Sequence, residues 1–296
     1  MSKISEELIR EWSAGDAERD RGLVTPEDIE RIDDIQYGPD EKWNLLDIYR
    51  PKNITGKLPV LMIVHGGAWV YGTKEIYQFY GMNLAQRGFA VVNANYRLAP
   101  AHKFPAQLED VNRQVLFVQR HAQEYGLDEL NIFMAGDSAG AHLLGLYLGI
   151  CTDPVYAELY PFRTPEGFLP RAVLMNCGVY DVGRTPVISE EGDRMLMQDL
   201  LPMGGTEEEM KRIQVTGHVN VKFPPTFIAT AEGDFAKPQA PFMEAALKAA
   251  GVIHKYHIYG TAEQPLYHNF EINQKEAAGL DCSREETDFL KKWIQH

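Results

Sequence analysis

The pentapeptide Gly-Asp-Ser-Ala-Gly occupies residues 136–140, between the apolar run 131–135 and an apolar stretch typical of a buried helix. The Gly-x-Ser-x-Gly pattern is common, and its simplest interpretation is a glycine-permitted turn between a strand and a helix. In this strand–turn–helix setting it can also present Ser138 as a nucleophile at the top of a sheet. The amide of Ala139 would then lie at a helix N-terminus, where it can stabilise an oxyanion.

A serine hydroxyl is a weak nucleophile unless a neighbouring base accepts its proton. The sequence must therefore supply a histidine at the same edge of the sheet. The chain has nine histidines, and most of them fall in predicted strands, predicted helices or early loops. His268 follows the last predicted strand and precedes a helix, in a loop that can return over the sheet edge. We therefore predict that His268 is the base.

The acid that orients this base is predicted to be Asp234, which follows the apolar strand pattern at 225–231. The order Ser138, Asp234, His268 is the order found in α/β-hydrolase folds. Two other acids stay open as alternatives: Asp181, after the preceding strand, and Glu232. Asp234 could also be an ordinary turn-forming residue after a glycine.

Donors for a tetrahedral oxyanion are predicted in the loop His-Gly-Gly-Ala-Trp-Val-Tyr-Gly at residues 65–72. Its two adjacent glycines leave the backbone unshielded, so that amides can point into a pocket. A phosphate-binding loop is the rival interpretation, but the sequence has neither the Gly-Lys-Ser nor the Gly-x-Gly-x-x-Gly pattern.

Short apolar runs alternate with longer amphipathic stretches along the chain, which is typical of strand–helix–strand units. The five runs between residues 58 and 231 are almost continuously apolar, as in a parallel sheet buried on both faces. The first two runs are too close together for a helical crossover and are predicted to form an antiparallel edge. Strands are expected at 32–37, 45–50, 58–64, 89–95, 131–135, 171–177, 225–231 and 254–259, and helices at 74–87, 106–125, 138–151, 239–251 and 283–295.

Two stretches lie outside this alternation. Residues 1–28 are polar and helix-prone, and residues 178–222 form a long excursion with two predicted helices. Insertions in α/β folds often cover the carboxyl edge of the sheet, so these two stretches are candidate cap elements of one domain, 1–296. The alternative is a surface excursion away from the site.

The composition of the chain limits the partners and the cellular location that can be expected. The formal net charge of −13 argues against nucleic acid and anionic membranes as partners. Three widely spaced cysteines suit a reducing compartment, and the N-terminus is too charged for a signal peptide. We also see no run of about 18 apolar residues that could cross a membrane. The expected location is the cytoplasm, and the sequence does not specify an oligomeric state.

Together these motifs resemble α/β-hydrolases of the hormone-sensitive-lipase-like branch and neighbouring bacterial acetylesterase- and feruloyl-esterase-like proteins. The matching segments are 65–72, 95–111, 136–144, 232–235 and the His-Asn-Phe at 268–270. The resemblance implies that Ser138 is the nucleophile, His268 the base and Asp234 its orienting acid. It places the oxyanion donors on the amides of Gly67, Ala68 and Ala139.

The chain departs from the usual pattern where Ala68 replaces a third glycine and Asn269 replaces a glycine after the histidine. A methyl group at Ala68 is expected to be tolerated if the backbone angles there are ordinary, although it could narrow the acyl pocket.

The expected function is a serine carboxylesterase that needs neither metal nor cofactor. Its substrates would be short-chain acyl or aryl esters, such as acetylated sugars or hydroxycinnamate esters. Activity should fall on acidification through roughly pH 6.5 as the base protonates. An amide hydrolase of the formamidase type is the enzymatic alternative, and a non-catalytic binding protein is the alternative of another class. Candidate pocket walls are Trp69 and Tyr71, beside the oxyanion loop, and Phe79 or Tyr80 nearby. The alternative is that these aromatic rings only pack the loop onto the sheet.

Overall fold

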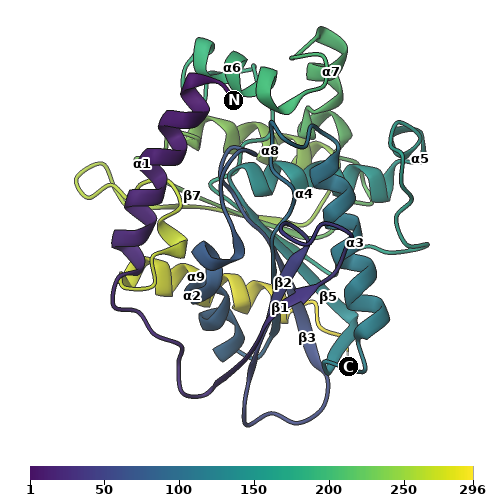
Figure 1. Ribbon diagram of the computed structural model, residues 1–296, viewed down its shortest axis with the longest axis vertical. Helices are drawn as coiled ribbons and strands as arrows, with labels where there is room; N and C mark the ends of the chain where they lie inside the picture. The colour runs from purple at the N-terminus through teal and green to yellow at the C-terminus, as the bar shows by residue number, and fades with distance from the viewer. Residues whose placement is uncertain (296) are drawn as a thin grey trace.

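The computed structural model describes residues 1–295 as an eight-stranded sheet with helices on both faces (Figure 1). The strand order is β1-β2-β4-β3-β5-β6-β7-β8, and only the pairs β1–β2 and β2–β4 are antiparallel. The predicted mostly parallel sheet with an antiparallel edge is therefore confirmed. The strands are β1 (Ile29–Gln36), β2 (Leu45–Pro51), β3 (Leu58–Val64), β4 (Ala90–Ala94), β5 (Leu127–Asp137), β6 (Val173–Asn176), β7 (Thr226–Ala231) and β8 (His254–Tyr259).

The apolar runs of the central strands are explained by burial on both faces. Successive side chains of a strand point to opposite sides, and β3 divides its residues accordingly. Val60, Met62 and Val64 belong to one hydrophobic cluster, whereas Leu61 and Ile63 belong to the other. The first cluster lies under α3 (Ala106–His121), α4 (Ala139–Thr152) and α8 (Ala240–Ala249), and the second under α2 (Lys74–Gln86) and α9 (Ala277–Lys291).

The two stretches outside the alternation meet at one end of the molecule. Helix α1 (Lys3–Asp20) lies beside α6 (Glu190–Leu200), with α7 (Glu207–Arg212) nearby (Figure 1). The carboxylate of Asp199 accepts hydrogen bonds from the hydroxyl groups of Ser2 and Ser5, both at 2.7 Å. Because Ser5 and Asp199 are buried, this contact anchors the first turn of α1. The helices predicted in both stretches are present.

The C-terminal helix differs from its predicted bounds of 283–295, because α9 begins at Ala277 and ends at Lys291. Gly279 in its first turn lowers helix propensity, which hid the start of the helix in the sequence. The structure explains this glycine, since an added Cβ would overlap the carbonyl oxygen of Asn273. Strand β5 is longer than the predicted 131–135 at both ends.

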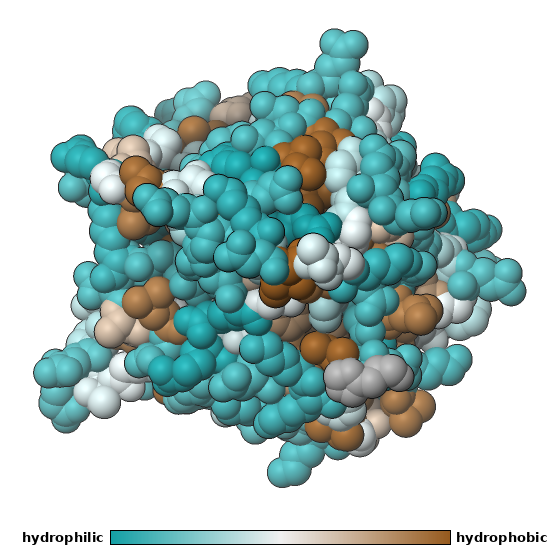
Figure 2. Space-filling model, turned by 90° about the horizontal axis from the view of Figure 1, so that it is seen from below, coloured by the Kyte–Doolittle hydropathy of each residue, from teal (hydrophilic) through white to brown (hydrophobic). Residues whose placement is uncertain are grey.

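One face of the molecule is mainly polar (Figure 2). The face shown in Figure 2 carries mainly hydrophilic side chains, with the apolar ones in small separate groups. Between residues 1 and 295, none of the helices combines the length and hydropathy required to span a bilayer.

Candidate active site

Ser138 stands on a sharp turn between β5 and α4, with φ of 50° and ψ of −119°. A non-glycine residue in this region is strained, and such strain persists where the surroundings impose it. The flanking glycines allow the required close packing. An added Cβ at Gly136 would lie 2.6 Å from the Gly140 carbonyl oxygen, and one at Gly140 would overlap the carbonyl oxygen of Val64. The glycines of the pentapeptide are thus explained by backbone contact between strand and helix.

The structure brings Ser138, His268 and Asp234 into one hydrogen-bonded series. His268 Nδ1 lies 2.6 Å from Asp234 Oδ1, and His268 Nε2 lies 2.9 Å from Ser138 Oγ. A carboxylate can only accept, so Nδ1–H donates to Asp234 and leaves Nε2 as the acceptor for the serine hydroxyl. This is the geometry that a serine nucleophile and its base require.

Asp234 is held as a charged carboxylate by its neighbours. Burial by itself would raise the pKa of this group, but the hydrogen bond from His268 brings the pKa below its usual value. The Ala236 amide and the Thr230 hydroxyl, each at 2.8 Å, also donate to this carboxylate. Asp234 is therefore suited to orient the imidazole and to stabilise its protonated form.

The two alternative acids are engaged elsewhere. Asp181 accepts hydrogen bonds from the hydroxyl of Thr216 at 2.6 Å and the guanidinium of Arg184 at 3.0 Å, and so braces the 178–222 excursion. Glu232 forms an ion pair with Lys237 at 2.9 Å. Of the three candidates, Asp234 is the one that the structure brings to the histidine.

Two buried histidines near the site have structural surroundings. His65 stacks on Tyr96 with ring centroids 4.0 Å apart, and His142 Nε2 lies 2.9 Å from the Ile213 carbonyl oxygen. Burial lowers the pKa of each imidazole to about 4, so both rings are neutral near pH 7. His65 is therefore a packed, neutral part of the loop that follows β3.

The loop after β3 adopts an unusual backbone. Gly67, Ala68 and Trp69 have φ of 110°, 48° and 63°, so the angles at Ala68 are not the ordinary ones expected for a tolerated methyl group. Within residues 1–295, the amides of Gly67 and Ala68 have no protein acceptor. Ala139 is the first residue of α4, and its amide has no acceptor within the helix. The three predicted donors are therefore available to a ligand.

Ser138 lies between two hollows of very different size. The larger has a volume of about 450 Å³ and is lined by His268, Gly67, Tyr71 and residues of α1 that include Trp12. The smaller has a volume of about 30 Å³ and an almost wholly apolar lining. Ser138 and the side chains of Trp12 and Phe235 contribute to both. The lining of the smaller hollow includes Ala68, Ala139, Val179, Ile188, Leu196 and Met197.

The expected aromatic walls are confirmed only in part. Tyr71 lines the larger hollow and Trp69 the smaller one. Tyr80 was a wrong expectation, because its hydroxyl points into the core and donates to Glu286 Oε2 at 2.9 Å. Phe79 packs against the same core cluster and lies outside the lining of both hollows.

Sequence reasoning missed Trp12 and Phe235. Trp12 packs beside Tyr71 with ring centroids 6.1 Å apart, and the Tyr71 hydroxyl donates to Asp16 at 2.8 Å. These contacts join residues more than fifty positions apart, and the polar pattern of residues 1–28 carries no signal for them. Phe235 directly follows Asp234, so its position in the sequence could have indicated it. Its ring stacks on the His268 imidazole with ring centroids 3.9 Å apart.

Comparison with known proteins places this site in a family. The sequence pattern of the BD-FAE family matches residues 46–241, which include Ser138 and Asp234. The chain belongs to the BD-FAE family. Esterase LipQ of Mycobacterium tuberculosis is 31% identical over 225 residues, which cover 74% of this chain and 53% of that protein. Carboxylesterase NlhH of the same species is 29% identical and is covered to 75%, with 78% of this chain aligned.

Solved structures of esterases share the fold. Esterase B of Lactobacillus rhamnosis superposes with a TM-score of 0.87 at 22% identity, over 98% of this chain and 97% of that chain. Brefeldin A esterase, described as a bacterial homologue of human hormone-sensitive lipase, gives a TM-score of 0.77 at 20% identity. The superposition covers 98% of this chain and 85% of that chain. These solved structures therefore share the predicted fold. The chain spans about half, or less, of the length of the first curated relatives that it matches.

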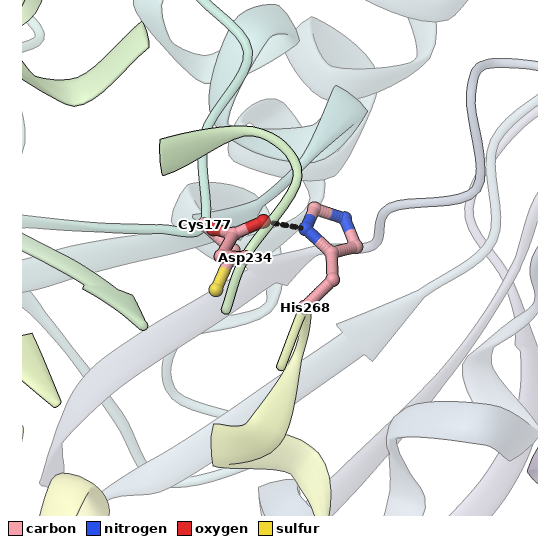
Figure 3. Close-up of side chains that lie close together, drawn as sticks. All are labelled: Cys177, Asp234 and His268. Atoms are coloured by element: carbon pink, nitrogen blue, oxygen red, sulfur yellow. Dashed lines mark hydrogen bonds and ion pairs between the residues drawn. The ribbon is translucent and has the colours of Figure 1, made fainter. Parts of the chain in front are cut away.

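In this BD-FAE family member, Cys177 lies beside the Asp234–His268 pair, and the three side chains resemble a metal-binding group (Figure 3). A hydrogen bond joins Asp234 to His268, whereas the Cys177 thiol donates to Glu271 Oε2 at 3.7 Å. Burial raises the pKa of the Cys177 thiol well above its usual value. His268 Nδ1 is already engaged with the carboxylate, so the arrangement fits hydrogen bonding better than metal binding.

Proposed function

We propose that the protein is a serine carboxylesterase in which Ser138, His268 and Asp234 form the catalytic triad. The observation that carries the proposal is the series of two hydrogen bonds from Ser138 through His268 to Asp234, beside three amides free to bind an oxyanion. The names of the relatives support it, since LipQ and NlhH are described as an esterase and a carboxylesterase.

The chemistry follows from these positions. Ser138 Oγ attacks the ester carbonyl while His268 Nε2 takes the hydroxyl proton. The amides of Gly67, Ala68 and Ala139 bind the negative oxygen of the tetrahedral intermediate. The protonated histidine then gives its proton to the departing alcohol, and a water activated by the same histidine hydrolyses the acyl-enzyme.

The two hollows support an assignment of the two halves of the substrate. The departing alcohol must lie next to His268, and His268 lines the larger hollow but not the smaller one. The acyl chain then points toward Ala68 and Ala139, into the smaller hollow. A volume of about 30 Å³ holds one or two water-sized groups, so the preferred acyl group is acetyl or propionyl. A hydroxycinnamoyl group is too large for this position, and the alcohol can be bulky.

Helix α1 and the 178–222 excursion act as a cap in this proposal. Trp12 of α1 lines both hollows, and Leu196 and Met197 of α6 close the smaller one. The cap would set the permitted length of the acyl chain.

Two isomeric esters test the proposal: 2-naphthylmethyl acetate and methyl 2-naphthylacetate. Both release an alkyl alcohol, so their intrinsic reactivities are similar, but only the first places the small group on the acyl side. We expect kcat/KM at least tenfold higher for the acetate. A preference for the second ester, or for methyl ferulate, would overturn the assignment of the hollows. An N-formyl anilide in the same assay measures amide cleavage.

The nucleophile is tested with a fluorophosphonate probe. The wild-type protein should be labelled, and Ser138→Ala should be neither labelled nor active. Near wild-type ester cleavage by Ser138→Ala would refute the triad, and an unlabelled, inactive wild-type protein would favour a binding role.

A further inference from the structure

A buried hydrogen-bonded bridge lies beneath the candidate nucleophile. The side chain of Asp137, the residue before Ser138, accepts a hydrogen bond from the Tyr77 hydroxyl at 2.8 Å. The same hydroxyl accepts a hydrogen bond from the Gly66 amide at 2.9 Å. Tyr77 and Asp137 are both buried, with exposed fractions of 3% and 4%. Two side chains therefore connect the nucleophile turn to the residue before Gly67.

The backbone of the oxyanion loop passes directly over this bridge. An added Cβ at Gly66 would lie 2.7 Å from Asp137 Oδ2 and 3.1 Å from the Tyr77 hydroxyl oxygen. The phenol has one proton, which it gives to Asp137, so its oxygen faces the Gly66 amide as an acceptor. Donation to a buried carboxylate is among the stronger hydrogen bonds in proteins, so the bridge orients the amide group of Gly66. The carbonyl oxygen of Gly66 accepts a hydrogen bond from His65 Nδ1 at 2.7 Å.

The loop needs such a restraint. Immediately after Gly66, three consecutive residues have positive φ, and two of them, Ala68 and Trp69, are not glycine. These conformations are costly and persist only where the surrounding structure imposes them. A catalytic oxyanion site also depends on amides that point to the oxyanion before it forms. The Tyr77 contact lies at the start of this strained stretch.

We propose that Tyr77 and Asp137 are positioning residues that hold the amides of Gly67 and Ala68 toward the oxyanion. This inference rests on the proposed esterase function and adds to it a requirement for two side chains that act through the Gly66 peptide, although Tyr77 also borders the larger hollow. The bridge couples the position of the nucleophile to that of the oxyanion donors.

Tyr80 offers a matched control for Tyr77. It lies three residues further along α2, has the same 3% exposure, and its hydroxyl donates to the buried carboxylate of Glu286 at 2.9 Å. Its hydroxyl accepts from the side chain of Asn176 at 3.4 Å, and not from a backbone amide of the oxyanion loop. Tyr77→Phe and Tyr80→Phe remove the same group from the same helix, but only the first breaks the bridge.

The test compares catalysis with binding of a trifluoromethyl ketone, which forms an oxyanion when Ser138 adds to it. All rates are expressed per site titrated with a fluorophosphonate, so that unfolded protein does not contribute. For Tyr77→Phe we expect a 10- to 100-fold lower kcat, a KM within about twofold, and ketone affinity that falls by the same factor as kcat/KM. Tyr80→Phe should keep kcat within about twofold. Asp137→Asn retains an acceptor for the Tyr77 hydroxyl, so its kcat should lie between those of Tyr77→Phe and wild type. Its ketone affinity should again fall by the same factor as kcat/KM.

Equal losses in Tyr77→Phe and Tyr80→Phe would overturn the inference while leaving the proposed function intact. An unchanged ketone affinity in Tyr77→Phe would also overturn it. If Tyr77→Phe does not fold, an unchanged ketone affinity in Asp137→Asn has the same meaning. A wild-type protein without ester cleavage would overturn both the inference and the proposed function.

Discussion

The Asp234 carboxylate accepts the Nδ1 proton of His268 at 2.6 Å, and this bond decides which ring nitrogen faces Ser138. Asp234→Asn removes the charge and allows the imidazole to adopt the other tautomer, with a proton on Nε2. We expect kcat to fall by about 10⁴-fold with little change in KM. Steady-state kinetics on 4-nitrophenyl acetate measures the loss.

Asp181→Asn is the control for this prediction, because Asp181 is also buried and hydrogen-bonded but braces Thr216 and Arg184. Its substitution should lower stability and leave kcat within a few-fold of wild type. A larger loss of kcat in Asp181→Asn than in Asp234→Asn would show that the acid has been assigned to the wrong residue.

Acyl-chain preference should respond to Ile188, which lines the smaller hollow and is only partly buried. Ile188→Ala removes three carbon atoms from the wall, so the best 4-nitrophenyl ester should shift from acetate toward butyrate or hexanoate. One added methylene contributes about 1–3 kcal/mol of specificity in a pocket that fits it, or roughly tenfold or more in kcat/KM.

Ile76→Ala provides the comparison, since Ile76 lines the larger hollow. That variant should alter the preference among alcohol groups and leave the acyl series unchanged. If Ile76→Ala lengthened the preferred acyl chain and Ile188→Ala did not, the acyl group would have to be assigned to the larger hollow and the alcohol to the smaller one.

The meeting of Ser138, His268 and Asp234 could be predicted from the sequence, because each of them directly follows a recognisable strand or lies in the loop after one. Parallel strands bring their carboxyl ends to one edge, so the topology alone places Ser138, Asp234 and His268 together. The lining of the smaller hollow could not be predicted in this way. Trp12 and Met197 meet near Ser138 through packing of α1 against α6, and neither helix carries a motif that specifies its partner.

The buried carboxyl groups escaped sequence reasoning for a related reason. Glu286 lies in the charged stretch Ser-Arg-Glu-Glu-Thr-Asp at 283–288, which is typical of an exposed helix face. In the structure it is fully buried between α9 and the sheet, where Asn176 and Tyr80 donate to it. Its burial depends on partners more than a hundred residues away.

Close packing at Gly140 predicts a steric effect. Gly140→Ala would place a methyl group against the backbone of Val64, which cannot move without disturbing β3. We expect a loss of about 2–4 kcal/mol in the free energy of unfolding, together with reduced kcat, because the turn at Ser138 is displaced. Urea denaturation of Gly217→Ala gives the baseline, since an added Cβ there meets no atom within 4 Å. Similar stabilities of the two variants would contradict the packing argument.

Glu286 predicts an unusual dependence of stability on pH. Burial raises the pKa of this carboxyl group from 4.5 to about 7. Between these values the folded protein keeps a proton that the unfolded chain releases, so the Glu286 contribution to stability falls as pH rises through this range. A glutamine at this position does not titrate, so the Glu286→Gln variant does not lose this contribution as pH rises. Relative to wild type, the free energy of unfolding of the variant should rise by up to about 3 kcal/mol between pH 4.5 and pH 8.

The adjacent Glu285 supplies the control, because its pKa shifts in the opposite direction. Burial by itself would raise the pKa of Glu285, but hydrogen bonds from Lys255 and His257 bring it below 4.5. Glu285→Gln removes a contribution that is complete above about pH 4.5 and is lost only at lower pH, so the difference between this variant and wild type should stay nearly constant from pH 4.5 to 8. The difference should also be small because the pair with Lys255 is partly exposed. Urea denaturation over this range should therefore give a rising difference for Glu286→Gln and a nearly constant one for Glu285→Gln. A flat difference for Glu286→Gln would mean that Glu286 is ionised throughout this range.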